Sequence, residues 1–184
     1  MTFSAARSRS RVGIWGFVLT LALVVIGLAP GATAAAPPLP AAVTNIPTMD
    51  ITLADGVSLS TVNNGSKDTV YRSTATITDP AGTYNLNADP AAGAEFKGRG
   101  NYTWRLPKKP YQLKFDSSTS ILGMPAAKAW VLLANDADGS LMRNKLMYDF
   151  ANSIGLAYSS ESRWVDLRVN GKYVGNYLVT EKVE

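Results

Sequence analysis

Basic side chains occupy a glycine-rich turn in the middle of this chain, where they could bind an anion. Residues 95–115 read EFKGRGNYTWRLPKKPYQLKF, so that Gly98 and Gly100 flank Arg99. Glycine permits backbone conformations that bring the chain close to a ligand. Taken alone, such a turn is more typical of a plain hairpin. Arg99 therefore becomes a candidate only in combination with the residues that follow it.

The strand predicted after this turn carries a lysine on its apolar face. Side chains alternate along residues 109–115, so Lys109 is expected to point the same way as Tyr111 and Phe115. Lysines that only protect an edge strand would face solvent instead. Lys109 is therefore the strongest candidate for binding an anion.

A helix predicted over residues 140–154 places an arginine on its buried stripe. The stripe consists of Arg143, Met147, Phe150 and Ile154. Asp138 and its neighbours supply turn and capping chemistry, and Lys145 and Asp149 form a pair on the outer face. A buried, unpaired guanidinium costs several kcal/mol, so Arg143 needs a carboxylate, a carbonyl or a ligand phosphate. A structural ion pair and a phosphate contact both remain open.

Composition excludes several kinds of chemistry. The 184 residues contain neither cysteine nor histidine, which removes disulfides, thiolate metal sites and histidine-based catalytic triads. The formal net charge is +4, but three arginines lie in the N-terminal leader, and the rest of the chain has 15 basic and 14 acidic residues, or +1. This near-neutral charge gives no support for a nucleic-acid partner, and we predict none.

The N-terminus is predicted to be a targeting segment. Arginines at 7, 9 and 11 precede an uncharged apolar run over residues 12–28, and Ala-Thr-Ala at 32–34 offers a cleavage site. We therefore predict a signal peptide over residues 1–34, secretion, and membrane contact through this segment only. An uncleaved N-terminal membrane anchor is the alternative. Residues 35–47, mostly alanine and proline, predict an extended linker.

From residue 48 onward the pattern is mainly β. Four β-branched or aromatic segments are separated by turn signals, at 49–55, 57–62, 69–79 and 83–87. Short strands at this spacing predict an antiparallel sheet. Residues 164–169 and 172–183, joined by Asn-Gly at 170–171, predict a hairpin with a type I′ turn. After this hairpin the sequence ends at Glu184 without a closing helix or strand. We therefore interpret residues 48–184 as an incomplete domain.

Taken together, these residues resemble the spore coat protein H (CotH) kinase family. The family's blocks read approximately GRGN-x-TW, PKKPY-x-LKF, LGMP, K-x-WVLLAN, D-x-SL-x-RN and VNG-x-Y-x-G-x-Y. All six occur here in that order. Each block is weak alone, but six in order form a specific pattern.

The resemblance implies an α+β fold, an atypical protein-kinase-like N-lobe that is mainly antiparallel sheet with one principal helix and is truncated before the C-lobe. It also implies ATP and Mg²⁺ as cofactors, and phosphoryl transfer to Ser or Thr of a secreted or surface protein. Carried onto this sequence, Arg99 and Lys109 correspond to phosphate-neutralising groups, with Lys109 as the ATP lysine. Arg143 takes the place of the usual helix glutamate, and Glu181 lies where hinge residues meet the adenine.

Family members complete phosphoryl transfer with carboxylates from their second half, including a WDFD-like metal motif. This sequence has no WDFD. We therefore expect no catalytic residue and no metal ligand here, and no activity of the chain alone. Two non-catalytic alternatives stay open: a secreted carbohydrate- or cell-wall-binding module that uses Tyr102, Trp104 and Trp164, and a structural component of an envelope or extracellular layer.

Overall fold

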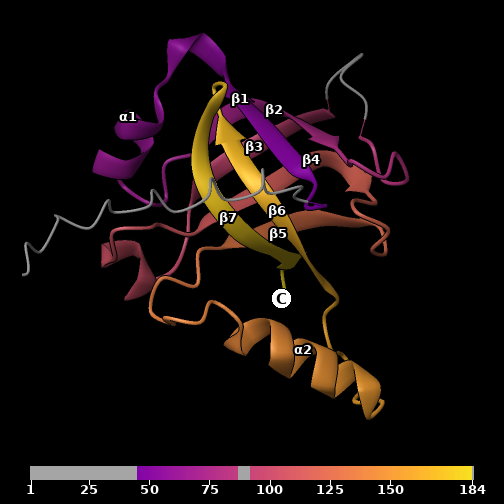
Figure 1. Cartoon of the computed structure of the whole chain (residues 1–184). Helices are drawn as coiled ribbons and strands as arrows, with labels where there is room; N and C mark the ends of the chain where they lie inside the picture. Colours follow the sequence, from indigo (N-terminus) through magenta and orange to yellow (C-terminus); the bar gives the residue numbers. More distant parts are fainter. Residues whose placement is uncertain (1–44, 87–91, 184) are drawn as a thin grey trace, which may run out of the picture. The chain divides into compact units, whose positions relative to one another are not determined.

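The computed structural model describes residues 45–86 and 92–183 (Figure 1). The predicted signal peptide at 1–34, and residues 35–44 of the predicted linker, lie outside these residues and stay predictions. The first strand begins at Thr48.

The described residues form a closed barrel of seven strands. The strands are β1 (Thr48–Leu53), β2 (Tyr71–Thr78), β3 (Ala92–Gly98), β4 (Tyr111–Thr119), β5 (Ala127–Leu133), β6 (Ser162–Val169) and β7 (Lys172–Glu181). Around the barrel their order is β1-β2-β3-β4-β5-β7-β6. Neighbours pair antiparallel, except that β1 pairs parallel with β6 and so closes the ring.

This barrel shows that the predicted fold class is wrong. We predicted an α+β N-lobe with an antiparallel sheet and one principal helix, whereas the structure is a mixed barrel. Local patterns identify strands and hairpins, but the closing pair joins Met49 to Leu167, far apart in the chain. Such a long-range parallel pairing has no local sequence signature.

The helices are short and lie between strands. They are η1 (Ala54–Gly56), α1 (Leu59–Asn64), η2 (Thr103–Arg105) and α2 (Arg143–Ser153). The strand predicted over 57–62 is wrong, because this segment forms α1. Ser58 caps that helix by accepting a hydrogen bond from the backbone N–H of Thr61 at 3.1 Å, and Val62 is buried. Of the predicted strand 83–87, the described part forms an isolated bridge between Leu86 and Ile77.

Large side chains from all around the barrel fill its interior. Those that are completely buried include Met49, Ile77, Phe96, Leu113, Phe115, Trp130 and Leu132. Tyr111 stacks on Phe96 with 4.9 Å between ring centroids. The hydroxyls of the two buried tyrosines are satisfied, since Tyr111 donates to Asn63 at 2.8 Å and Tyr177 to the carbonyl of Lys109 at 3.0 Å.

The predicted β6–β7 hairpin is confirmed. Asn170 and Gly171 have φ values of 50° and 74°, both positive, as a type I′ turn requires. The Asn170 side chain also accepts a hydrogen bond from Leu53 N and donates one to Val57 O, at 2.9 and 2.8 Å. These bonds tie the hairpin to the end of β1, next to the closing pair of strands.

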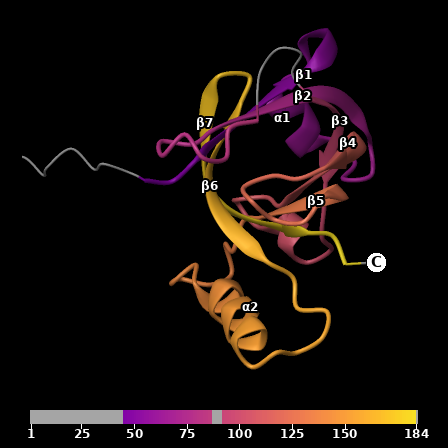
Figure 2. The ribbon, with the colours of Figure 1, turned by 90° about the vertical axis from the view of Figure 1, so that its right-hand side faces the viewer.

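The predicted buried stripe of α2 is wrong. None of the helix residues is buried, and Arg143 and Phe150 are 82% and 56% exposed. The half-buried positions include Lys145 and Tyr148 instead. Both views show α2 outside the barrel, beyond one of its ends (Figures 1 and 2). In the described ranges, no helix is long and apolar enough to cross a membrane.

Two polar side chains organise the loop before α2. Asp138 accepts hydrogen bonds from the backbone N–H of Arg143 and from the Ser140 hydroxyl, both at 2.8 Å. Asn135 donates to the carbonyl of Leu141 at 2.9 Å and accepts from the Asn144 side chain at 2.7 Å. The turn contacts predicted for Asn135 and Asp138 are therefore present, whereas the N-cap residue of α2 is Met142, whose side chain makes no capping hydrogen bond.

We predict that Gly98→Ala destabilises the fold. A Cβ on Gly98 would stand 2.5 Å from the indole of Trp104 and 2.9 Å from Lys67 Cα. Because neither the ring nor the backbone can move freely, we expect the free energy of unfolding to fall by about 1–3 kcal/mol. Urea denaturation measures it, with Gly139→Ala as control because that Cβ meets open space. Equal stability of the two variants would contradict the close contact.

We also predict that Asp138 stabilises the fold in a pH-dependent manner. Its pKa lies below the ordinary value, mainly because the backbone N–H of Arg143 donates to its carboxylate. A lowered pKa in the folded state means that the stabilisation is complete above about pH 3.9 and is lost as the pH falls through the folded value.

The difference in melting temperature between the wild type and Asp138→Ala should therefore be largest near neutral pH and narrow in acid. Asp136→Ala, at an exposed neighbouring aspartate, is the control. A difference that does not change with pH would show that the Asp138 charge plays no part.

Candidate functional site

A pocket of about 240 Å³ lies between the loop that precedes β4, the end of β5 and the loop that leads into α2. Leu106, Pro110 and Leu133 supply part of its apolar wall. Its polar lining consists of Arg99, Thr103, Lys108, Asn135, Asp136, Asp138, Arg143 and Asn144. The pocket therefore collects three cationic side chains from separate segments of the chain.

Lys108 is the most desolvated cation of the pocket. Its ammonium donates to the carbonyl of Asn176 and lies 4.6 Å from the ring centroid of Tyr177. Burial lowers the pKa of Lys108, and Asp136 opposes this shift. In the described part of the chain, no carboxylate lies within ion-pair distance of this ammonium. Donor capacity therefore remains for a ligand.

An irregularity in β7 makes room for Lys108. The register between β6 and β7 shifts beside Leu167, and Gly175 adopts a φ of 139°, which L-residues rarely take. A Cβ at Gly175 would stand 3.2 Å from Lys108 Cε. The glycine and the bulge together let the lysine stem lie against the strand.

Arg99 reaches the same pocket from the glycine-rich turn. Its backbone N–H donates to the carbonyl of Pro110 at 3.1 Å, which fixes the turn against the start of β4. Gly100 follows with a φ of 83°, whereas Gly98 does not have a positive φ and is packed by Trp104. In this turn the conformational freedom of glycine is therefore used at Gly100, whereas Gly98 is required for close packing. The Arg99 side chain is half-buried, and no carboxylate pairs with it within residues 45–86 and 92–183.

The two acidic residues of the pocket differ in what they do. Asp138 is engaged by the loop, and the Arg143 guanidinium lies 3.6 Å from its carboxylate. Asp136 is exposed and acts on Lys108 through its charge. The charge of Arg143 is balanced by that of Asp138. Arg99 and Lys108 then outweigh the single charge of Asp136, so the pocket has a net positive charge. Such a pocket can bind an anion.

Two of the four residues predicted for nucleotide binding line this pocket, namely Arg99 and Arg143. Lys109 does not line it. Its ammonium donates to the carbonyl of Trp104 at 2.6 Å and lies over the Trp104 ring, 4.8 Å from the centroid. Lys109 also precedes β4 and is separated from it by Pro110, so strand alternation does not set its direction. The neighbouring Lys108 lines the pocket where Lys109 was expected.

Glu181 lies elsewhere, at the exposed end of β7 opposite Trp130. It borders two other depressions, one with Lys114 and Lys128 and one with Glu161. The structure therefore does not bring Glu181 to the residues with which the sequence grouped it.

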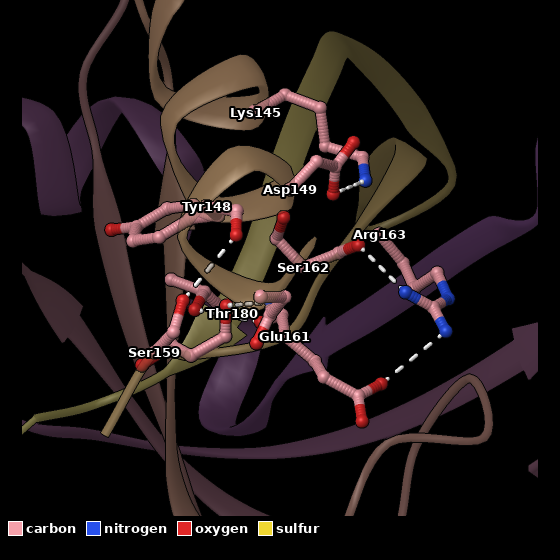
Figure 3. Close-up of polar contacts among 10 residues, drawn as sticks. Lys145, Tyr148, Asp149, Ser159, Glu161, Ser162, Arg163 and Thr180 are labelled. Carbon is pink, nitrogen blue, oxygen red and sulfur yellow. Dashed lines mark hydrogen bonds and ion pairs between the residues drawn. The ribbon is translucent and has the colours of Figure 1, made fainter. Parts of the chain in front are cut away.

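A second cluster of polar side chains joins α2 to the start of β6 (Figure 3). Arg163 pairs with Glu161 at 3.3 Å, and the Thr180 hydroxyl donates to the carbonyl of Glu161 at 2.9 Å. The buried Ser162 hydroxyl finds no hydrogen-bond partner among the described atoms. Ser159 and Glu161 of this cluster border the same depression as Glu181, and the contacts of the cluster connect elements of the fold.

The described residues were also compared with the ligand sets that hold metal ions. Within the described ranges, no group of three or more aspartates, glutamates, histidines or cysteines is placed to hold a metal ion. The cationic donors of the pocket fit phosphate.

Comparison with known proteins identifies the segment that contains this pocket. Residues 96–184 match the family model described as CotH kinase protein. Over 86 residues, the chain is 35% identical to inner spore coat protein H of Bacillus subtilis (strain 168), and this alignment covers 47% of the chain and 23% of that relative. Every residue that lines the pocket falls inside 96–184. The resemblance predicted from the motif blocks is therefore confirmed for residues 96–184, which are similar to the CotH family.

Proposed function

We propose that the pocket binds the phosphate groups of a nucleotide. The observation that carries this proposal is the pair of half-buried cations, Arg99 and Lys108, that share one pocket without a carboxylate partner in the described residues. An arginine can bind a phosphate with two parallel hydrogen bonds, and a lysine binds it as a compact point charge. The family description, which names a kinase, supports the same ligand.

The size of the pocket limits which part of a nucleotide it holds. Its volume of about 240 Å³ is smaller than the roughly 300–1,000 Å³ of sites that enclose a whole small molecule. We therefore assign the phosphate chain to the pocket and place the nucleoside outside it. Glu181 does not line this pocket, so its proposed adenine contact is independent of the phosphate site.

The reaction proposed is ATP-dependent phosphoryl transfer to a Ser or Thr of a secreted or surface protein. Bound ATP would supply the phosphoryl group, while Arg99 and Lys108 would neutralise and orient its oxygens. Mg²⁺ is proposed from the family alone. Because the sequence has no WDFD-like carboxylate motif, which the resemblance implies for the metal, this chain is proposed to bind nucleotide without turning it over.

The relative's name supports a location outside the cytoplasm. That protein is an inner spore coat protein, and the leader predicted over residues 1–34 favours export. We propose a coat or cell-surface location, with an uncleaved N-terminal anchor as the alternative.

A carbohydrate-binding role is the second candidate, and one groove favours it. Trp164 and Tyr84 line a depression of about 320 Å³ together with the buried Asp79. Aromatic faces suit the apolar face of a sugar ring, while the Asp79 carboxylate accepts hydrogen bonds from the backbone N–H groups of its own loop. Trp104, predicted for the same role, packs edge-on against Tyr111 with 6.2 Å between centroids, so the groove and not Trp104 carries this candidate.

We predict that Lys108→Ala and Arg99→Ala each weaken binding of ATP and of inorganic triphosphate by about 10-fold or more, because each removes a charge-assisted hydrogen bond of about 1.5–3 kcal/mol. Lys109→Ala should change affinity little but lower the melting temperature, since it loses the contact with Trp104. Isothermal titration calorimetry on the whole chain measures the affinities. Lys114→Ala, at an exposed lysine paired with Glu95, is the charge-matched control.

The pH dependence gives a second readout. Lys108 binds phosphate only when protonated, and its pKa is lowered, so affinity should decline with rising pH below the ordinary lysine pKa of about 10.4. Lys108→Ala should remove this decline. Loss of binding in Lys109→Ala with full binding in Lys108→Ala would restore the assignment made from the sequence and refute this one.

For the groove, we predict that Trp164→Ala abolishes retention of the chain on insoluble cell-wall polysaccharide, while Tyr102→Ala, at an aromatic residue outside the groove, does not. A pull-down assay measures retention. Equal retention of the two variants would remove the carbohydrate candidate.

A further inference from the structure

Helix α2 presents its apolar residues to solvent. Between 41% and 63% of each is exposed, and they follow one another along a single side of the helix. This α2 apolar stripe consists of Met142, which precedes the helix, and of Leu146, Met147, Phe150 and Ile154. Leu156 and Tyr158 extend it beyond the helix end.

The orientation of the helix is held by polar contacts on its other side. Lys145 pairs with Asp149 and is only 18% exposed. The Ser159 hydroxyl donates to the carbonyl of Tyr148 at 3.3 Å, and the Asn152 side chain donates to the carbonyl of Ser160 at 3.4 Å. Figure 3 shows the Lys145–Asp149 pair and the Ser159–Tyr148 bond. Turning the stripe inward would break the two bonds to Ser159 and Ser160, whereas the Lys145–Asp149 pair lies within the helix.

The stripe is large enough to form an interface. At roughly 150–200 Å² per large apolar side chain, five half-exposed residues present on the order of 500 Å², which is at the upper range for the largest patch of a monomer. Two such stripes in contact would bury about 1,000 Å², the lower bound for a specific protein–protein interface.

We propose that the α2 apolar stripe is the contact surface between two copies of this chain. Met142, Leu146, Phe150 and Ile154 are spaced four residues apart, and two ridges of this kind interdigitate when helices cross at about −50°. The one cation on this face, Arg143, is paired with Asp138, so two copies of the stripe can face each other across a two-fold axis. Both views place α2 outside the barrel, so two helices can meet before the barrels do.

Cross-linking tests this proposal directly, because the chain contains no cysteine. A single Leu146→Cys substitution places one thiol on the stripe, and mild oxidation should convert the 184-residue chain to a covalent dimer. Ser118→Cys places a thiol on an exposed position of β4 and should stay monomeric under the same conditions. Absence of a Leu146→Cys dimer, or equal yields from both variants, would overturn the proposal.

Analytical ultracentrifugation provides the second test. The wild type should sediment as a concentration-dependent dimer, Phe150→Glu as a monomer, and Ser118→Glu like the wild type. Phe150 is exposed, so its substitution should leave the circular dichroism spectrum and melting temperature unchanged. A monomeric wild type that instead binds phospholipid vesicles, or a dimer that Phe150→Glu leaves intact, would refute self-association through α2. Neither result depends on nucleotide binding.

Discussion

The parallel pairing of β1 with β6 closes the barrel, and the rest of the structure depends on it. Because β6 lies beside β1, the second strand of its hairpin, β7, is placed against β5. That position brings Asn176 and Tyr177 to Lys108, and the end of β5 to the loop before α2. The position of Lys108 in the basic pocket thus depends on how the ring closes.

Local rules predicted the elements that are held by local forces. The type I′ hairpin at 170–171 was recognisable because Asn-Gly tolerates two successive positive φ angles, and Asp138 because a carboxylate before a helix accepts its free N–H groups. The segment 57–62 alternates like a strand, yet Ser58 caps a helix there. Barrel closure was not predictable, because register between β1 and β6 is set by packing of residues that are distant in sequence.

The sequence predicted the segment that contains the candidate site, but it selected Lys109 where the structure places Lys108. Pro110 separates the lysine pair from β4, so the alternation that begins at Tyr111 does not extend to Lys109. A lysine with a carbonyl and an indole within reach is already satisfied, as Lys109 is. Choosing Lys108 from the sequence would have required knowing that β7 bulges at Gly175, a feature that belongs to the other side of the barrel.

The error over α2 links the pocket to the apolar stripe. Helical periodicity identified a coherent apolar face correctly, but amphipathicity does not specify which surface covers that face.

Arg143 lies next to Met142 of the apolar stripe and also lines the pocket. Because Arg143 is exposed, water screens its ion pair with Asp138, and this pair contributes little to stability. Contact between two α2 stripes would exclude water from this end of the helix and strengthen the interactions of Arg143 with Asp138 and with a bound phosphate alike. Self-association and anion binding would then be coupled through one residue.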